Sequence, residues 1–126
     1  MFAARCTCAV AILFGALACH ARADELPQGH QYFEQQVQPV LVGHCLECHG
    51  SEQKGGLDLR TRETALKGGE SGAAVAPKRP EESLLYEYVS THEMPPKKPL
   101  ADEQVAVVKK WIADGAYFPN EPLDPF

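Results

Sequence analysis

Two cysteines and a histidine lie at a spacing that suits covalent attachment of a flat cofactor. Cys45 and Cys48 are separated by two residues, and His49 follows directly. In a helical turn, residues three positions apart lie on one face, so both thiols can reach the two vinyl groups of one haem and form thioethers. His49 is then carried beneath the ring, where a neutral imidazole nitrogen can bind the iron. The C-x-x-C-H spacing is typical of c-type haem attachment.

Other kinds of site also use paired cysteines. A structural zinc site needs four ligands, usually including a second Cys or His pair, and the sequence offers no such pair. A thioredoxin-like redox pair belongs to a βαβ context, and the chain shows no alternating strands. A disulfide can form in an exported protein, but the adjacent His49 favours the use of Cys45 and Cys48 by haem.

Met94 is the residue that best suits the opposite face of the iron. It is the only methionine besides Met1, and pairing of methionine with histidine raises the reduction potential of a haem. Pro95 biases the backbone of Met94 towards an extended conformation, and Pro96 stiffens the segment further. Because a stiff segment loses little entropy when its thioether binds, we predict Met94 as the distal ligand.

Histidines supply the alternatives to Met94. His92 is the main one, since it lies two residues upstream in the same expected loop. His30 is expected ahead of the first helix, and His44 is tethered beside Cys45 with its ring expected to point to solvent. We therefore predict that neither His30 nor His44 is well placed for the iron.

The first part of the chain has the pattern of a targeting segment. Arg5 precedes an apolar run over residues 9–18, which is too short to span a bilayer. A small-x-small cleavage site follows at residues 21–23. We predict that residues 1–23 form a secretory signal peptide, as c-type maturation outside the cytoplasm requires. The alternatives are a lipoprotein signal ending at Cys19 and an uncleaved membrane anchor.

Charge and length bound the function of the remaining chain. The sequence has 17 acidic residues against 12 Lys and Arg, with a net charge of −5. Loss of residues 1–23 would remove two arginines and no acid, which makes the protein more acidic. An acidic surface disfavours nucleic acid and suits a redox partner protein with a basic patch. We predict one cytochrome c domain over residues 24–118, a Pro-rich tail over 119–126, and no membrane span after cleavage.

Apolar residues at helical spacing predict three or more helices along the chain. The first helix is expected over residues 31–42, where Pro39 either kinks it or marks its true start. Another helix should open at Pro80 and end before His92. The last is predicted over residues 102–114. We also expect a brief helix capped by Thr61, and Trp111 as a core anchor against the first helix.

Basic residues in the predicted loops have two interpretations each. Arg60 and Arg62 lie in the long stretch after the haem motif, where they either pair with haem propionates or remain solvated surface charges. Lys97 and Lys98 follow Met94 and make a positive spot on an acidic protein. They either help to orient a partner or only keep the loop solvated.

Residues 33–118 resemble the planctomycete-type cytochrome c domain, within the wider mono-haem c-type cytochromes. The resemblance is carried by seven motifs, namely VQPVL at 37–41, CLECHG at 45–50, GGLDLRTR at 55–62, GGESG at 68–72, ESLL at 82–85, MPPK at 94–97 and WIADGA at 111–116. It implies a small all-α cytochrome fold, with Cys45 and Cys48 as attachment sites for haem c. It also implies His49 as the proximal ligand of the iron and Met94 as the distal one.

The sequence departs from the pattern of such domains in two ways. Residues 77–80, with the sequence PKRP, lack a glycine that similar sequences usually have there, so this loop is expected to differ. Such domains also often precede much longer chains. The protein is therefore expected to be either a free electron carrier or a shortened relative of a longer protein.

These observations lead to a main functional prediction and two alternatives. The main prediction is an exported mono-haem cytochrome that transfers single electrons through His49- and Met94-ligated iron and is not an enzyme. The first alternative is a haem-based sensor or peroxidase-like enzyme with a displaceable sixth ligand. The second is an interaction module in which haem serves only as a structural staple.

Overall fold

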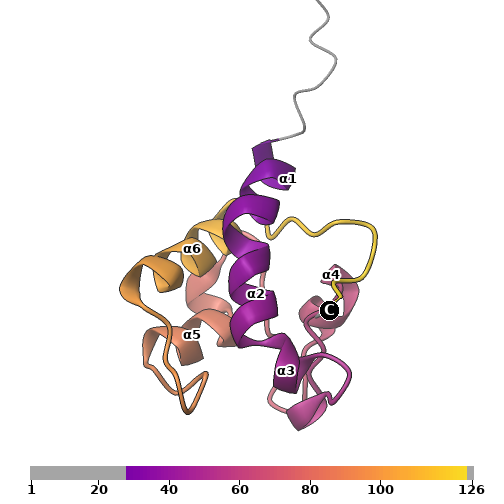
Figure 1. The fold of residues 1–126 in the computed structure, drawn as a ribbon, viewed down its shortest axis with the longest axis vertical. Coiled ribbons are helices and arrows are strands. Elements are labelled where there is room, and N and C mark those ends of the chain that lie inside the picture. The colour runs from indigo at the N-terminus through magenta and orange to yellow at the C-terminus, as the bar shows by residue number, and fades with distance from the viewer. Residues whose placement is uncertain (1–27, 125–126) are drawn as a thin grey trace, which may run out of the picture.

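The computed structural model describes residues 28–124, and these form a helical fold without a β-strand. Its longest feature is a continuous helical rod of three segments, α1 (Gln28–Tyr32), η1 (Phe33–Val37) and α2 (Gln38–His44). The rod runs down the molecule and leads into α3 (Leu46–His49) (Figure 1). His30 therefore lies within the first helix and not ahead of it, which corrects the prediction. The predicted signal peptide, residues 1–23, lies outside the described residues.

Pro39 is accommodated by a widened turn in this rod. A proline inside a helix has no N–H to donate, and its ring clashes with the carbonyl four residues earlier. In η1 the chain is π-helical, and the N–H of Gln38 bonds to the carbonyl of Phe33, five residues earlier. Pro39 then occupies the first turn of α2, where its missing N–H costs little. The chain is thus helical on both sides of Pro39, which lies in the first turn of α2 and does not mark the true start of the first helix.

The expected helix from Pro80 is divided in two. A single 3-10 turn, η3 (Pro80–Glu82), precedes α5 (Leu84–Ser90). Ser83 separates them in an extended conformation and is buried. Its hydroxyl accepts a hydrogen bond from the N–H of Ala76 at 2.8 Å and donates to the carbonyl of Arg79 at 3.0 Å. The prediction of one uninterrupted helix was wrong because this buried hydroxyl binds the backbone of the preceding loop.

Two shorter elements form the other side of the molecule. The hydroxyl of Thr61 accepts the N–H of Thr64 and caps α4 (Arg62–Lys67), as predicted. The turn η2 (Lys54–Gly56) lies between α3 and this helix. It meets the loop after α4, where the N–H of Glu70 donates to the carbonyl of Gly55 at 2.9 Å.

The core lies between the rod and the last helix, α6 (Asp102–Ala113). Trp111 is fully buried with its ring centroid 6.1 Å from that of Phe33, which confirms its predicted role as a core anchor. Its indole N–H donates to the carbonyl of Tyr117 at 2.7 Å, so its polar atom is satisfied. Helices α5 and α6 lie on one side of the rod and α4 on the other (Figure 1).

The last described residues, 119–124, are not helical and return towards α4. The N–H of Leu123 donates to the carbonyl of Arg60 at 2.8 Å, and the Leu123 side chain is buried. Within residues 28–124, no helix combines the length and the apolar character needed to cross a membrane.

Candidate functional site

The two cysteines and the histidine lie at the end of the rod, where the chain turns into α3. Cys45 joins α2 to α3, and its carbonyl accepts the N–H groups of Cys48 at 3.3 Å and His49 at 2.8 Å. Leu46, inside this turn, is buried and ties it to the core. The Cys45 side chain is also buried, whereas Cys48 and His49 are half-buried. This single turn therefore presents two sulfur atoms and one imidazole together.

These three side chains line a cavity of about 320 Å³. Met94 and the two prolines after it form another part of the cavity wall. The remaining walls are mostly apolar and include Leu57, Leu59, Ala74, Leu84, Leu85, Tyr88 and Val89. Two thiols, an imidazole and a thioether in an apolar cavity fit a large flat cofactor that is held by thioethers and carries a metal at its centre.

The second nitrogen of His49 has a definite partner. Its Nδ1 lies 3.0 Å from the carbonyl oxygen of Lys54, in η2. A carbonyl can only accept, so Nδ1 carries the proton and Nε2 keeps the lone pair that an iron would use. The backbone before and after Lys54 is left-handed, at Gln53 and at Gly55, and this tight turn aims the carbonyl at the imidazole. The sequence alone did not identify this partner.

The two thiols have different surroundings. Both are free in the structure. Burial raises the pKa of the Cys45 thiol to about 12. Cys48 is more open, and the ammonium of Lys54 lies 3.6 Å from its sulfur. The negative charge of a Cys48 thiolate, and after it that of Glu52, raises the pKa of Lys54. Among the described residues, no three His, Cys, Asp or Glu side chains gather as a metal-ion site.

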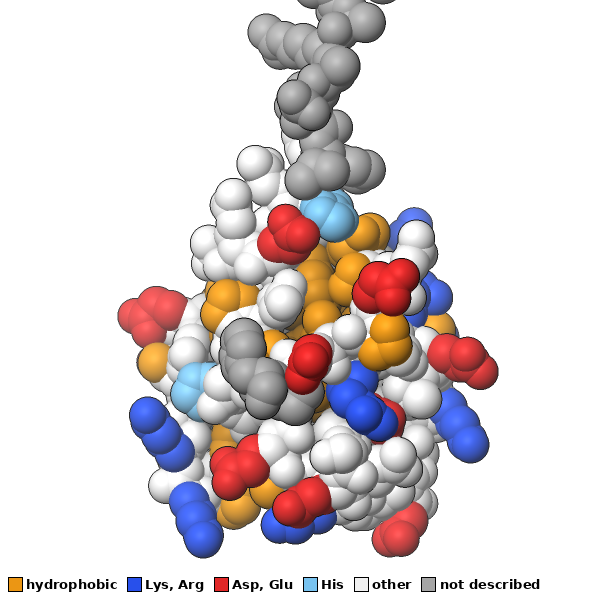
Figure 2. Space-filling model, turned by 45° about the vertical axis from the view of Figure 1, so that its right-hand side comes forward, with side chains coloured by type: hydrophobic (Ala, Val, Ile, Leu, Met, Phe, Trp, Pro, Cys, Tyr) orange, Lys and Arg blue, Asp and Glu red, His pale blue; other side chains and the backbone are white. Residues whose placement is uncertain are grey.

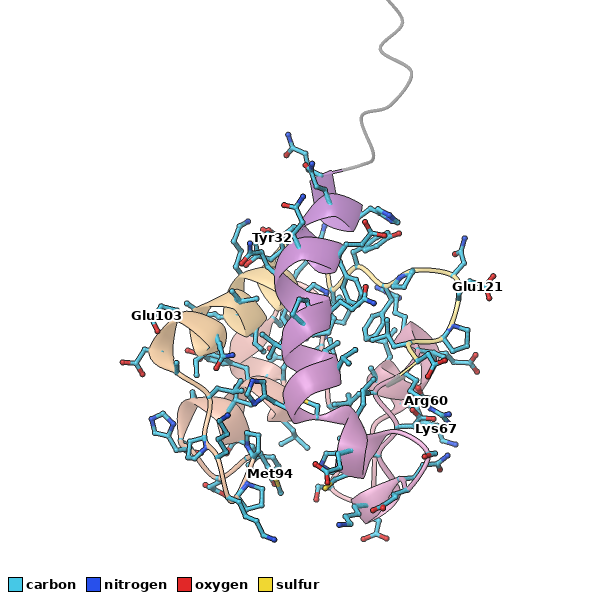
Figure 3. All side chains as sticks on the ribbon, in the orientation of Figure 1. Tyr32, Arg60, Lys67, Met94, Glu103 and Glu121 are labelled. Carbon is cyan, nitrogen blue, oxygen red and sulfur yellow. The ribbon has the colours of Figure 1, made fainter. Side chains whose placement is uncertain are left out.

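Met94 reaches the cavity from the loop after α5. Its side chain is 39 % exposed. The N–H groups of Glu93 and Met94 both donate to the carbonyl of Tyr88, at 2.9 and 3.1 Å, which anchors the start of the loop. Figure 3 shows Met94 at the end of the molecule where α3 and this loop lie. His92, its main alternative, is exposed with a positive φ of 61° and does not line the cavity.

Residues 45–98 match the family model of planctomycete cytochrome C. The predicted resemblance is thus confirmed for the stretch from the first cysteine to the second lysine after Met94. The match supports a haem-binding c-type cytochrome with haem and iron as its cofactor. No curated protein and no solved structure shows a significant match to the chain.

The matched stretch does not contain His30, and the structure places that residue away from the cavity. Its Nδ1 lies 2.6 Å from the hydroxyl of Tyr117, and its Nε2 lies 3.0 Å from the carboxylate of Glu34. His44, in contrast, lines the cavity and is half-buried. Its Nε2 is 3.1 Å from the side-chain nitrogen of Gln104. The expectation that His44 points freely to solvent was therefore wrong.

Two of the three arginines in the matched stretch, Arg60 and Arg62, make hydrogen bonds within the protein. Arg60 binds Asp58 through Nε at 3.1 Å and Nη2 at 2.9 Å, and these hydrogen bonds lower the pKa of the carboxyl. Arg62 donates to the carbonyls of Ala116 at 3.3 Å and Gly115 at 3.5 Å. Neither arginine lines the cavity, and Figure 3 shows Arg60 on the other side of the molecule from Met94. Both arginines therefore have partners within the protein, and their pairing with haem propionates stays a prediction.

Sequence reasoning missed the backbone contribution to this site. Lys54 takes part through its carbonyl, which leaves no signal in a side-chain motif. Gly55 has a left-handed conformation, and the glycine pair at residues 55–56 was the only sequence signal that indicated a turn there. Tyr88 takes part through a carbonyl as well, and only its membership of the apolar face of α5 was predictable.

Proposed function

We propose that the protein is an exported mono-haem c-type cytochrome that carries single electrons. Cys45 and Cys48 would form the two thioethers to one haem c, with His49 and Met94 as axial ligands of its iron. The observation that supports this best is the single apolar cavity on which the thiols, the imidazole and the thioether all lie. The family match over residues 45–98 points to the same cofactor.

Each of these residues has a separable task. The cysteines hold the cofactor by covalent bonds, while the Lys54 carbonyl keeps the proton of His49 on Nδ1 and leaves Nε2 for the iron. Met94 would supply its thioether as a second ligand of the iron, from a proline-stiffened loop. The apolar walls exclude water and so favour burial of the ring. Haem would supply the one-electron couple of its iron, and the chain supplies ligation, burial and charge placement.

A second candidate function rests on the exposure of Met94. A side chain that is 39 % exposed on a loop with few hydrogen bonds is easier to displace than one fixed in a core. Displacement would open a coordination position, as a haem sensor or a peroxidase-like enzyme requires. The electron carrier is preferred because no arginine lines the cavity in the described residues, so a distal Arg/His pair of the kind that would act on a bound peroxide is not formed there.

Absorption spectra test the proposal directly. The protein should be produced in a host with c-type maturation and recorded in oxidised and reduced forms. We expect low-spin haem spectra in both, and haem that stays with the chain on extraction into acidified organic solvent. Rapid and complete carbon monoxide binding by the ferrous protein would favour the sensor or enzyme. Release of the haem into the solvent would refute covalent attachment.

The proposed location and partner follow from export and charge. Haem attachment outside the cytoplasm requires export to the periplasm or a comparable compartment, and we propose cleavage after residue 23. Charged side chains of both signs are interspersed over the face shown in Figure 2, while the chain as a whole is acidic. We propose a redox partner protein that presents a basic patch, and no nucleic acid.

Charge reversal at two exposed lysines, one in the Met94 loop and one far from it, tests where the partner docks. Lys97 lies in the loop of Met94 and Lys67 on α4, and both are exposed. Neither has an ion pair within residues 28–124, and Figure 3 shows Lys67 far from Met94. We expect electron-transfer rates to fall with added salt. Lys97→Glu should change the rate, whereas Lys67→Glu, with the same change in net charge, should not. Equal effects of the two variants would argue against docking at the Met94 loop.

A further inference from the structure

The side chain of Gln104 makes two hydrogen bonds whose directions are fixed. The N–H of Ala101 donates to Gln104 Oε1 at 3.0 Å, and Gln104 Nε2 lies 3.1 Å from His44 Nε2. A backbone N–H can only donate, so the amide oxygen must face Ala101 and the –NH₂ group must face His44. His44 Nε2 is therefore the acceptor, and the proton of its neutral imidazole lies on Nδ1.

This bond joins two walls of the cavity. His44 is the last residue of α2 and directly precedes Cys45, so it belongs to the wall that carries the thiols. Gln104 lies in the first turn of α6, and Ala101 ends the loop that begins at Met94. His44 is 60 residues from Gln104 in the sequence, and both side chains are half-buried.

The Met94 loop is otherwise held only at its ends. At its start, the carbonyl of Tyr88 accepts the N–H of Met94. At its finish, Leu100 is buried and the N–H of Ala101 is bound by Gln104. In the described structure, the backbone over residues 95–100 makes no hydrogen bond. Within the described residues, the hydrogen bond between Gln104 and His44 is thus the one polar link between the end of this loop and the cavity wall that carries the two cysteines.

We propose that Gln104 is a positioning residue, which acts through His44 to hold the Met94 loop over the cavity. This inference rests on the proposed function, in which the Met94 thioether binds the iron. Loss of the bond would leave the cysteines and His49 in place but free the finish of the loop. Met94 would then leave its position more often, and an external ligand would enter more readily.

The experiment uses two substitutions of His44. In His44→Gln, the amide oxygen is as many bonds from the backbone as Nε2, so it can still accept from Gln104. His44→Leu cannot accept, yet it leaves the bond between Gln104 and Ala101 intact. In the haem-loaded protein we expect His44→Leu to bind added imidazole roughly fivefold to tenfold faster, which corresponds to one lost hydrogen bond. His44→Gln should stay within about twofold of the parent.

Amide hydrogen exchange gives a readout that does not depend on the iron. The N–H of Ala101 should exchange faster in His44→Leu but not in His44→Gln, while that of the core residue Val108 keeps its protection in both. Equal behaviour of the two variants, in imidazole binding and in exchange, would overturn the proposal. If the N–H of Val108 exchanged faster in His44→Leu than in His44→Gln, the effect would be due to general destabilisation, and the proposal would also be overturned.

A separate variant distinguishes this proposal from the function on which it rests. If Met94→Ala leaves imidazole binding as slow as in the parent, Met94 is not the ligand and the proposed function fails. If Met94→Ala speeds binding and His44→Leu does not, the ligand assignment stands and only the role of Gln104 is refuted.

Discussion

The two sides of the cavity are built in different ways. The side of Cys45 and His49 comes from five consecutive residues, on a short helix that continues a long rod and is tied to the core by Leu46. The side of Met94 is a proline-rich loop, half open to solvent and fixed only at its ends. The first is specified by local sequence, and the second by contacts between residues far apart in the chain.

The two sides are expected to have different tasks, namely attachment of the haem on one side and control of its potential and ligand access on the other. Covalent capture of the cofactor needs only the local turn, because its geometry comes from hydrogen bonds within residues 45–49. The proposed ligation by Met94 depends on where its loop is held, and loops are more mobile than helices. Changes at the first side should therefore affect whether haem is present, and changes at the second should affect its potential and its access to ligands.

The largest effect is expected from removal of both thiols. In the Cys45→Ala/Cys48→Ala variant no thioether can form, so acidified organic solvent should extract essentially all haem from any protein recovered. The fold should also lose stability, because a small domain has a limited core and depends on a covalently bound group such as haem. Extraction followed by a haem stain of the denatured chain measures this. A stain that persists in the double variant would contradict the attachment site.

Substitution of Met94 should spare attachment and change the iron. Met94→Ala is expected to keep its covalent haem, lose the near-infrared sulfur-to-iron band of the ferric protein and open the iron to carbon monoxide. Its potential should fall by on the order of 100 mV, a part of the range of about 0.8 V that axial ligands span. His92→Ala is the matched control and should leave all of these unchanged. The reverse pattern would make His92 the ligand.

Asp58 does not line the cavity and should affect stability alone. Asp58→Asn loses the charge-assisted bonds to Arg60 and is expected to cost about 1–2 kcal/mol of unfolding free energy near neutral pH. Because Arg60 lowers the pKa of Asp58 in the folded state, this stabilisation is present above the unfolded carboxyl pKa and disappears as pH falls through the folded one.

Denaturant titrations from neutral to acid pH check this expectation. The parent should lose stability in acid and converge with the variant, whose own profile should be flatter. The haem spectrum should not differ between them, since neither Asp58 nor Arg60 lines the cavity. A difference that persists at the lowest pH would show that the pair is not the cause.

The smallest effect concerns His92, which lies two residues beyond the end of α5. His92 has a positive φ of 61°, which glycine adopts without the steric penalty of a side chain. His92→Gly is therefore expected to raise the free energy of unfolding by up to about 1 kcal/mol. The near-infrared band should be unaffected. Thermal unfolding monitored in the far ultraviolet measures the shift, and a loss of stability would mean that the His92 side chain makes a contribution of its own.

Local signals predicted much of this molecule. The motif at residues 45–49, the cap at Thr61 and the helix ended by Gly115 depend on neighbours within a few positions, so the sequence shows them. The break between η3 and α5 at Ser83 does not depend on such near neighbours. The Ser83 hydroxyl hydrogen-bonds to the N–H and the carbonyl of Ala76, in a loop that lies beside it only in the folded chain.

The cavity shows the same limit. The residue types that face the cofactor were predictable, but the carbonyl of Lys54 was not, because every residue has a carbonyl and only backbone geometry selects one. The contact of His44 with Gln104 depends on how the first and last helices pack, which periodicity alone does not determine. Pairings between distant residues need the three-dimensional structure.

The residue type at position 69 is constrained although Gly69 itself has no proposed chemical role. A methyl group at this position would overlap the carbonyl of Gly55, which also accepts the N–H of Glu70. Gly55 directly follows Lys54, whose carbonyl holds the imidazole of His49. Any larger residue at position 69 would therefore push on the turn that orients the histidine. The choice of amino acid there is restricted by His49, the proposed iron ligand, 20 positions earlier in the sequence.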